Sequence, residues 1–248
     1  MDRSQSRQSL RSATILVAIL AMLSGVIVAL GGLSPAQAAG QQIFDGPDST
    51  VRTVAAGANG VLYLGGDFTR WGPQTGGGAA LATDDGSVRR TLPPVAGQVL
   101  AAVPDGVGGW YIGGSFSAVA GQPRNNAAHI LPTGALDPNW TPNPSATVRA
   151  LAVSGTTVYV GGDFTSIGGQ ARNRIAALDT SGAATAWNPN ASSRVTAIAV
   201  SGSTVYVGGI FTTIAGQTRN RIAALDTTTG AATAWNPNAT SNVNTIAV

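Results

Sequence analysis

Few side chains in this sequence could carry out acid–base, nucleophilic or metal chemistry. All 11 acidic residues are Asp, all 14 basic residues are Arg, His129 is the only histidine, and there is no cysteine. Without cysteine the chain has no disulfides, thiolate nucleophiles or Cys-ligated zinc. One histidine cannot build a His-based metal site or complete a Ser–His–Asp triad when no matching nucleophile and acid are marked, so we interpret His129 as incidental. We therefore expect no catalytic residue, no metal and no cofactor.

Two carboxylates stand at a repeated position. Asp67 and Asp163 each follow a Gly-Gly pair, but the same position holds Ser115 and Ile210 in other copies, so a chemical role repeated in every copy is not expected. A phosphate-binding role for the Gly pairs would need a P-loop or GxGxxG pattern before a helix, and neither is present. Glycine inside a strand is typical of a bulge or a close backbone approach. The first glycines of the pairs, Gly65, Gly113, Gly161 and Gly208, are thus expected to be structural.

Large aromatic residues recur at fixed positions. We expect them to form the core between repeats; the residues are Tyr63, Tyr111, Tyr159, Tyr206, Phe68, Phe116, Phe164 and Phe211. Three tryptophans also recur, namely Trp140, Trp187 and Trp235. Burial is the expected use of these tryptophans, and an exposed row that stacks on sugar rings is the alternative, which makes them the candidate ligand-binding residues.

Polar residues recur beside the aromatics. A glutamine follows each Phe by six residues, and we expect it to make a structural hydrogen bond; the four are Gln74, Gln122, Gln170 and Gln217. Arginines recur as well, at Arg124, Arg172 and Arg219 in three copies and at Arg174 and Arg221 in two, with Asp179 and Asp226 five residues beyond the latter. Arg–Asp pairing within or between repeats is the expected role of these charges.

These residues sit in a tandem repeat. The motif Tyr-x-Gly-Gly-x-Phe begins at residues 63, 111, 159 and 206, so the copies are 48, 48 and 47 residues apart, and residues 148–194 match 195–242 at 37 of 47 aligned positions. Periods of this length are typical of propellers. The third copy predicts strands at 148–153, 158–164, 175–178 and 184–187, joined by Gly, Ser and Asn turns, which is the composition of a four-stranded antiparallel blade.

The repeats define the expected architecture, which is an all-β propeller. We predict blades at about 51–98, 99–147, 148–194 and 195–242, and residues 243–248 (VNTIAV) resemble the first strand of a fifth. Propellers have 4–8 blades, so we expect an incomplete ring that belongs to a longer propeller, with further domains possible after residue 248. The alternative is that the fifth strand closes a four-bladed ring against the N-terminal segment.

The motifs resemble a known family. GGxF, then GQ, RNRIAALD, a Gly turn and WNPN are similar to the bacterial secreted β-propeller repeats of unknown function, of the delta-sixty type; the likeness spans roughly residues 51–248. The first copy departs from it because it lacks RNR and WNP. The resemblance implies a secreted or surface-attached propeller, often joined to other extracellular modules. It implies no catalytic residue.

The N-terminal sequence has the pattern of an export signal. Residues 1–12 carry three Arg, residues 13–33 are almost wholly apolar, and Ala-Gln-Ala follows at 36–38, which is the order of a secretory signal peptide. We expect cleavage after Ala38, a linker at 39–50, and no membrane span afterwards; an uncleaved anchor is the alternative. Without residues 1–38 the chain keeps 11 Arg and 10 Asp, so it lacks the charge of a nucleic-acid-binding protein.

Three functions are open from the sequence. The first is a secreted, non-catalytic scaffold that binds an extracellular protein or glycan. The second is an extracellular polysaccharide hydrolase or lyase, which without Glu would need two Asp as its acid–base pair. The third is a structural spacer in a larger surface protein.

Overall fold

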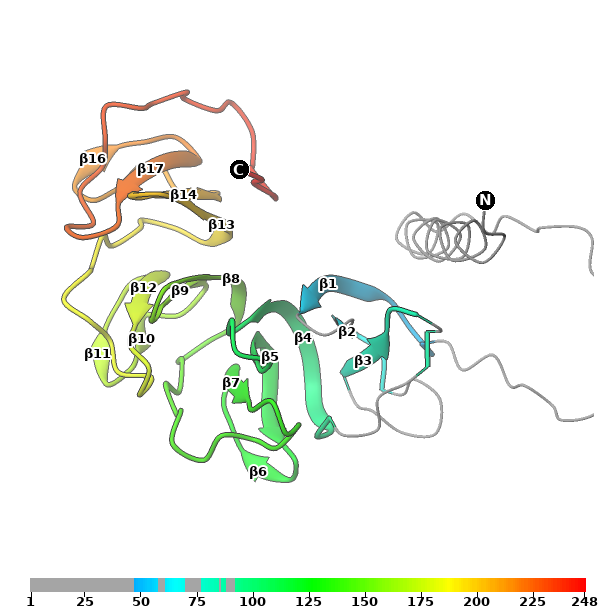
Figure 1. Cartoon of the computed structure of the whole chain (residues 1–248). Helices are drawn as coiled ribbons and strands as arrows, with labels where there is room; N and C mark the ends of the chain where they lie inside the picture. The colour runs from blue at the N-terminus through cyan, green and yellow to red at the C-terminus, as the bar shows by residue number, and fades with distance from the viewer. Residues whose placement is uncertain (1–46, 58–60, 70–76, 85, 88–91) are drawn as a thin grey trace, which may run out of the picture.

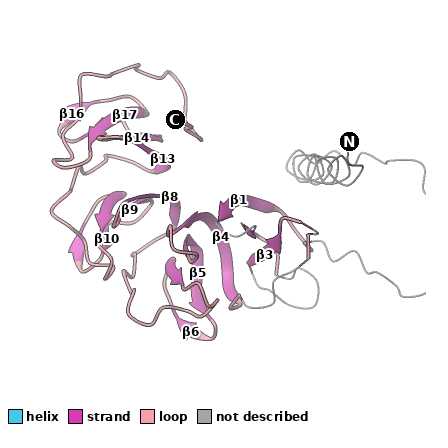
Figure 2. Cartoon of the chain, viewed as in Figure 1, coloured by secondary structure: helices cyan, strands magenta, loops and turns pink. Residues whose placement is uncertain are grey.

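The computed structural model describes residues 47–248 except 58–60, 70–76, 85 and 88–91, so the predicted signal peptide, most of the linker and Gln74 lie outside the described residues. The described residues form antiparallel strands and turns and contain no helix (Figure 2). Among them there is accordingly no helix long and apolar enough to cross a membrane. The predicted all-β class is confirmed.

Four blades follow one another along the chain, one for each repeat, and in blades 3 and 4 a short hairpin forms a separate two-stranded sheet. Blade 1 has β1 (Val51–Gly57), β2 (Val61–Gly66) and β3 (Gly78–Ala82); blade 2 has β4 (Val95–Pro104), β5 (Trp110–Val119), β6 (Gln122–Pro123) and β7 (Ala127–Ile130). Blade 3 has β8 (Val148–Ser154), β9 (Thr157–Gly162), β10 (Ser166–Ile167), β11 (Gln170–Ala171) and β12 (Ile175–Leu178). Blade 4 has β13 (Val195–Ser201), β14 (Thr204–Gly209), β15 (Thr213–Ile214), β16 (Gln217–Thr218) and β17 (Ile222–Asp226).

Each blade is an antiparallel meander whose first strand lies innermost. In blade 3 the order is β12-β9-β8, and in blade 4 it is β13-β14-β17. Figure 1 shows the blades along an arc, with β1, β4, β8 and β13 on its inner side. The described residues form no closed ring, so the propeller is incomplete, as expected.

The predicted strands of the third copy match the structure except at the outer edge. The first three correspond to β8, β9 and β12, but the predicted strand at 184–187 is reduced to one bridge, Leu178 to Ala184. Blade 4 has the matching bridge, Leu225 to Ala232. The WNPN segment that follows departs from strand geometry, since Asn190 and Asn238 have φ of 54° and 56°, the left-handed region that Asn tolerates.

The Gly-Gly pairs set the spacing between blades. A Cβ built on Gly65, Gly113, Gly161 or Gly208 would lie 2.3–2.6 Å from a Cγ1 of Val99, Val148, Val195 or Val243, the equivalent valine of the next copy. A Cβ on the second glycine of each pair would lie 2.0–2.2 Å from a backbone oxygen of its own blade. Because the first glycine has no side chain, the neighbouring blade can pack closely against it. The second glycine likewise lets the bulged inner strand of the same blade approach its backbone.

The contact of Gly208 with Val243 places the start of a fifth inner strand. The amide of Val243 donates to the carbonyl of Gly209 at 3.2 Å, and the hydroxyl of Thr196 donates to the carbonyl of Val243 at 2.6 Å. Residues 243–248 thus lie against blade 4 in the place that β13 occupies against blade 3, although they form no strand ladder.

Candidate functional site

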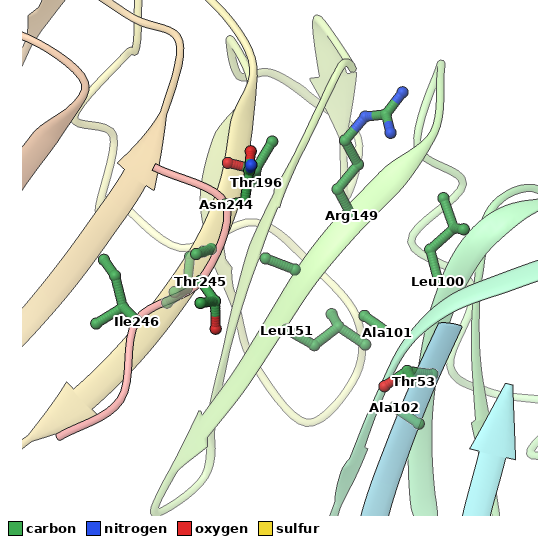
Figure 3. Close-up of a pocket in the computed structure, with 13 residues that line it drawn as sticks. Thr53, Leu100, Ala101, Ala102, Arg149, Leu151, Thr196, Asn244, Thr245 and Ile246 are labelled. Atoms are coloured by element: carbon green, nitrogen blue, oxygen red, sulfur yellow. The ribbon is translucent and has the colours of Figure 1, made fainter. Parts of the chain in front are cut away.

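The inner strands enclose an open cavity of about 170 Å³. Every blade and the C-terminal segment contribute to it (Figure 3); the lining residues are Thr53, Leu100–Ala102, Arg149–Leu151, Thr196–Ile198 and Asn244–Ile246. Blade 1 supplies Thr53 alone, and the same three positions of each later copy supply the other residues. Because a propeller's inner strands surround its axis, this cavity is the part of the funnel that the described blades form.

One position of the inner strand changes from copy to copy. The residue after the packed valine is Arg52, Leu100, Arg149, Thr196 and Asn244 in the five copies. The valines before them in blades 2–4 are fully buried. The fold therefore holds its packing residue constant and varies the neighbouring side chain, and in the last four copies that side chain lines the cavity.

Arg149 is held at the cavity by an ion-pair network. Its Nη2 lies 2.8 Å from an oxygen of Asp163, and Nε of Arg194 lies 2.5 Å from the other oxygen. Burial works to raise the pKa of Asp163, but hydrogen bonds and attraction from both guanidinium groups outweigh it and hold that pKa below its ordinary value. Arg194 precedes β13, so the network also joins blade 3 to blade 4.

The same pairing occurs in blade 1, where Arg52 binds Asp67 through two hydrogen bonds. Blades 2 and 4 have neither charge, since these positions hold Leu100 and Ser115 in blade 2 and Thr196 and Ile210 in blade 4. The sequence carried this signal: the Asp after the Gly pair is present in the copies whose inner strand begins Val-Arg. The two Asp are therefore partners of Arg.

The cavity offers hydrogen bonds and positive charge. Its polar groups are the guanidinium of Arg149, the hydroxyls of Thr53, Thr196 and Thr245, and the amide of Asn244. These groups suit hydroxyl, carbonyl or anionic ligand atoms. The described residues that line it include no carboxylate, so no acid–base pair faces the cavity from them.

A second polar cluster lies in blade 2, around His129. Its Nδ1 is 2.9 Å from Asp137 and its Nε2 is 3.1 Å from Asp105, while the ring stacks on Tyr111 with centroids 4.3 Å apart. The interpretation of His129 as incidental is corrected, because the ring joins the β4–β5 turn to the outer edge of the blade. No sequence pattern marks these partners, because Asp105 and Asp137 lie 24 and 8 residues away from His129.

Local hydrogen bonds fix both carboxylates of this cluster. Burial works to raise the pKa of Asp105, whose side chain is only 3% exposed, but the amides of Val107 and Gly109 and the His129 ring hold it below its ordinary value. The pKa of Asp137 is lowered against burial in the same way, by His129 and backbone amides. Burial, with the charges of Asp105 and Asp137, raises the pKa of Tyr111.

The candidate ligand-binding tryptophans do not form an exposed row. Trp140 and Trp187 are buried at 0% and 4% exposure, and Nε1 of Trp187 donates to the carbonyl of Asp226 in the next blade at 2.9 Å. Trp140 and Trp187 are therefore not accessible for stacking on a sugar ring. Trp235 is 43% exposed, and stacking by its ring stays a prediction.

The other repeated aromatics lie where the blades pack. The four Phe and Tyr63, Tyr111 and Tyr159 are buried, while Tyr206 is half-buried. In blades 2, 3 and 4 the ring centroid of the repeated Tyr lies within 5.5 Å of the ring centroid of the Trp in the same blade. The angles between the two ring planes are 51–85°.

The glutamines take a different place from the one expected. Gln122, Gln170 and Gln217 pair through their backbones at the tip of a short hairpin, opposite Val119, Ile167 and Ile214. Their side chains are exposed, and within the described part of the chain they make no hydrogen bond. The apolar residues opposite them in the hairpins are fully buried and pack in the core of the blade.

The expected pairing of the repeated Arg and Asp is wrong. Arg172 and Arg219 donate to the carbonyls of Thr185 and Thr233, on the outer edge of their own blades. Arg174 and Arg221, at φ of 65° and 64°, donate to the carbonyls of Ala191 and Ala239. Asp179 and Asp226 instead accept from amides and hydroxyls of their own turns. The arginines satisfy carbonyls that a full fourth strand would have paired.

No group of three or more His, Cys, Asp or Glu among the described residues could hold a metal ion. The described contacts therefore assign the charged residues to blade structure, and they leave the axial cavity as the candidate binding site.

Comparison with known proteins supports the fold. Residues 108–139, 157–184 and 204–228 match the family model of a "Domain of unknown function (DUF5122) beta-propeller". These segments lie in the second, third and fourth copies, so these three copies are similar to a propeller-repeat family of unknown function. No curated protein matches the chain.

Two solved structures of designed proteins are similar to the chain. The crystal structure of the computationally designed Ika4 protein has a TM-score of 0.52 at 16% identity, and the match covers 76% of this chain and 99% of that one. The computationally designed Ika8 protein matches at 12% identity with a TM-score of 0.38, over 81% of this chain and 78% of that one. At this identity the first likeness concerns the fold alone.

Proposed function

We propose that the chain is a secreted or cell-surface β-propeller scaffold, of the bacterial delta-sixty type, that binds an extracellular glycan or protein without catalysis. The observation that supports it is the inner strand, which repeats its buried valine and varies the side chain beside it. A binding scaffold needs both features, because constant packing residues keep the fold while variable neighbouring side chains determine which ligand is bound.

A hydroxyl-rich or acidic glycan is the ligand that the cavity suits best. Arg149 supplies a guanidinium whose Nε and Nη2 are bound to Asp163, which holds the group in place and leaves its remaining N–H donors for an anionic or hydroxyl-bearing group. The threonine and asparagine side chains at the same depth add neutral donors and acceptors. Pre-formed sites of this kind lose little conformational entropy when a ligand binds.

Binding by purified protein to a panel of bacterial surface polysaccharides tests the proposal. We expect binding that Arg149→Gln weakens on the order of tenfold, because a charge-assisted bond is lost. Arg52→Gln is the matched control, since Arg52 also pairs with an Asp but does not line the cavity. Equal loss in both variants, or binding that neither changes, would place recognition elsewhere.

Export is the second part of the proposal. The Arg-rich start, apolar run and Ala-Gln-Ala at 36–38 support it. N-terminal sequencing of protein from the culture medium or cell surface is expected to begin at Ala39. Protein that keeps residue 1 and stays in the cytoplasm would contradict it.

The enzymatic alternative makes a distinct prediction. A hydrolase or lyase would need two Asp facing the funnel; none of the described residues that line the cavity is an Asp, and Asp163 is joined to the lining through its ion pair with Arg149. Polysaccharide turnover abolished by Asp163→Asn, in a variant that still folds, would favour the enzyme. Absence of both turnover and binding would favour the spacer.

A further inference from the structure

Two guanidinium groups share one carboxylate where blade 3 meets blade 4. One oxygen of Asp163 binds Nε and Nη2 of Arg149, and the other binds Nε of Arg194. A single carboxylate balances only one of the two arginines, so the cluster keeps an uncompensated positive charge. Blade 3 lies between blades 2 and 4 in the described part of the chain, so the exposure of this cluster does not come from an end of the arc.

Both arginines keep hydrogen-bond donors that the protein does not use. A guanidinium has five N–H groups. Arg194 donates through Nε alone, and neither of its Nη groups has a hydrogen-bond partner among the described residues. The Nη1 group of Arg149 is unused in the same sense. The side chains of Arg194 and Arg149 are 42% and 31% exposed, so a ligand in solution can reach these donors.

A third arginine adds charge at the same place. The carbonyl of Arg174 accepts from the amide of Gly162, the residue before Asp163, at 2.9 Å. Its guanidinium donates to the carbonyl of Ala191 at 3.1 Å, a neutral acceptor that leaves the charge uncompensated. We call this end of blades 3 and 4, with Arg149, Arg174 and Arg194, the arginine rim.

The opposite end of the same blades is acidic. Strand β12 begins at the arginine rim, where Ile175 pairs with Gly161, and it ends at the opposite side, where Asp179 follows. Asp226 holds the same place at the end of β17 in blade 4. The charges of these two blades are therefore separated along the strand direction. Such a separation steers an anionic ligand toward the arginine rim and away from the other end.

The arginine rim is continuous with the axial cavity, because Arg149 belongs to both. In Figure 3 the Arg149 guanidinium points away from Leu151. Thr196 and Asn244 line the cavity with neutral polar groups. A sugar chain that carries both acidic groups and hydroxyls could therefore contact the rim and the cavity together.

We propose that Arg149, Arg174 and Arg194 bind carboxylate groups of an acidic polysaccharide, a polyuronate, at the arginine rim. This rests on the proposed function, because it specifies the glycan that the scaffold binds. The unused Nη edge of Arg194 presents two parallel N–H donors, which match the two oxygens of a carboxylate. A polymer with a carboxylate on each sugar can contact several arginines at once, so it is favoured over a single small anion.

Isothermal titration calorimetry on the unaltered protein tests the proposal with an oligogalacturonate and its methyl ester. The ester keeps the sugar backbone and its hydroxyls but has no charge. We expect the acid to bind on the order of tenfold tighter or more, and to bind more weakly as NaCl is added. Equal affinity for acid and ester would overturn the proposal while the scaffold function stands.

Failure of the inference and failure of the proposed function give different results. If the oligogalacturonate does not bind but another glycan of the panel does, the polyuronate is wrong and the scaffold function stands. If no glycan binds, both are wrong. Dextran sulfate that binds as tightly as the oligogalacturonate would show general attraction between charges, which would overturn recognition of carboxylates.

Arg194→Gln separates the arginine rim from the cavity, because Arg194 does not line the cavity. This variant should bind the oligogalacturonate on the order of tenfold more weakly and the ester unchanged. Arg52→Gln is the matched control, since Arg52 is 47% exposed and has Asp67 to itself. Equal losses in the two variants would contradict a site at the blade 3–4 junction. Circular dichroism of each variant separates weak binding from failure to fold.

Discussion

At the scale of single residues, the glycines and valines decide how the blades fit. Four glycines each face the equivalent valine of the next copy, at distances that leave no room for a side chain. Glycine is used here for close approach of two packed segments. The same pair recurs at every junction, which explains why the repeat keeps both residues.

Gly161→Ala is expected to destabilise the protein by about 1–3 kcal/mol, the range for overpacking a core. The added Cβ would lie 2.5 Å from a methyl carbon of Val195. Guanidinium unfolding measures the change. Val195→Ala should offset part of the loss in the double variant, because it removes that methyl; strictly additive losses would show that the two residues do not meet.

A second prediction at this scale concerns acid stability. Asp105 and Asp137 have lowered pKa values, so their contribution to stability is complete above the unfolded-state pKa near 4 and is lost as pH falls through the folded-state values. His129→Ala should destabilise the protein at neutral pH by about 1–3 kcal/mol, because it removes the hydrogen-bond partner of one oxygen of the buried Asp105 carboxylate.

The same variant should also lose less stability than the unaltered protein between pH 5 and pH 2. Unfolding curves at several pH values measure this. Ala occupies the equivalent places 177 and 224, so the substitution suits the strand. Parallel pH profiles for both proteins would show that the cluster does not set acid stability.

At the scale of elements, alternation and turn residues in the sequence predicted the three long strands of a blade. The two-residue strands were missed, because β10 and β11 are too short to give a pattern of their own. The fourth strand was overpredicted at 184–187: the run is apolar, but Arg172 satisfies the carbonyl of Thr185, and the chain turns away at the following Asn-Pro.

The candidate site was predictable only in part. The inner strand could be read from VRALAV, but residues that meet at the axis are about one period apart, and nothing within one copy marks their convergence. The pairs Arg52–Asp67 and Arg149–Asp163 were present in the repeat alignment as a joint change. The three partners of the His129 cluster come from one blade only, so comparison between copies gave no signal for them.

The turn after β12 provides the prediction at this scale. Asp179 accepts from the amides of Ser181 and Ala183 and from the Ser181 hydroxyl. Asp179→Ala should cost about 1 kcal/mol, the net value of such bonds. Thermal unfolding measures it, with Thr180→Ala, an exposed neighbour, as the control. Equal melting temperatures for the two variants would show that the carboxylate does not hold the turn.

At the scale of the whole molecule, the stability of each blade depends on its contacts with the adjacent blades. A blade in the middle of the series is covered on both sides, while blade 4 is covered on one side and, at its inner end, by residues 243–248. Repeat proteins of this kind gain much of their stability from contacts between adjacent units. Their end units therefore open more readily than their central ones.

Hydrogen exchange should show this gradient. Amides of β14 and β17 are expected to exchange faster than those of β9 and β12, although the two blades are nearly identical in sequence. Equal protection in both blades would mean that the blade, and not its neighbour, determines local stability.

The glycine–valine contact also bears on how such a gene can grow. Because the contact crosses from one copy to the next, a DNA segment of one period can be duplicated from any starting point. Its two ends then meet partners of the correct type, as long as its length stays near 47 or 48 codons. Unequal crossing-over between similar copies would therefore yield foldable products, and lineages should differ in copy number more freely than in the length of a copy.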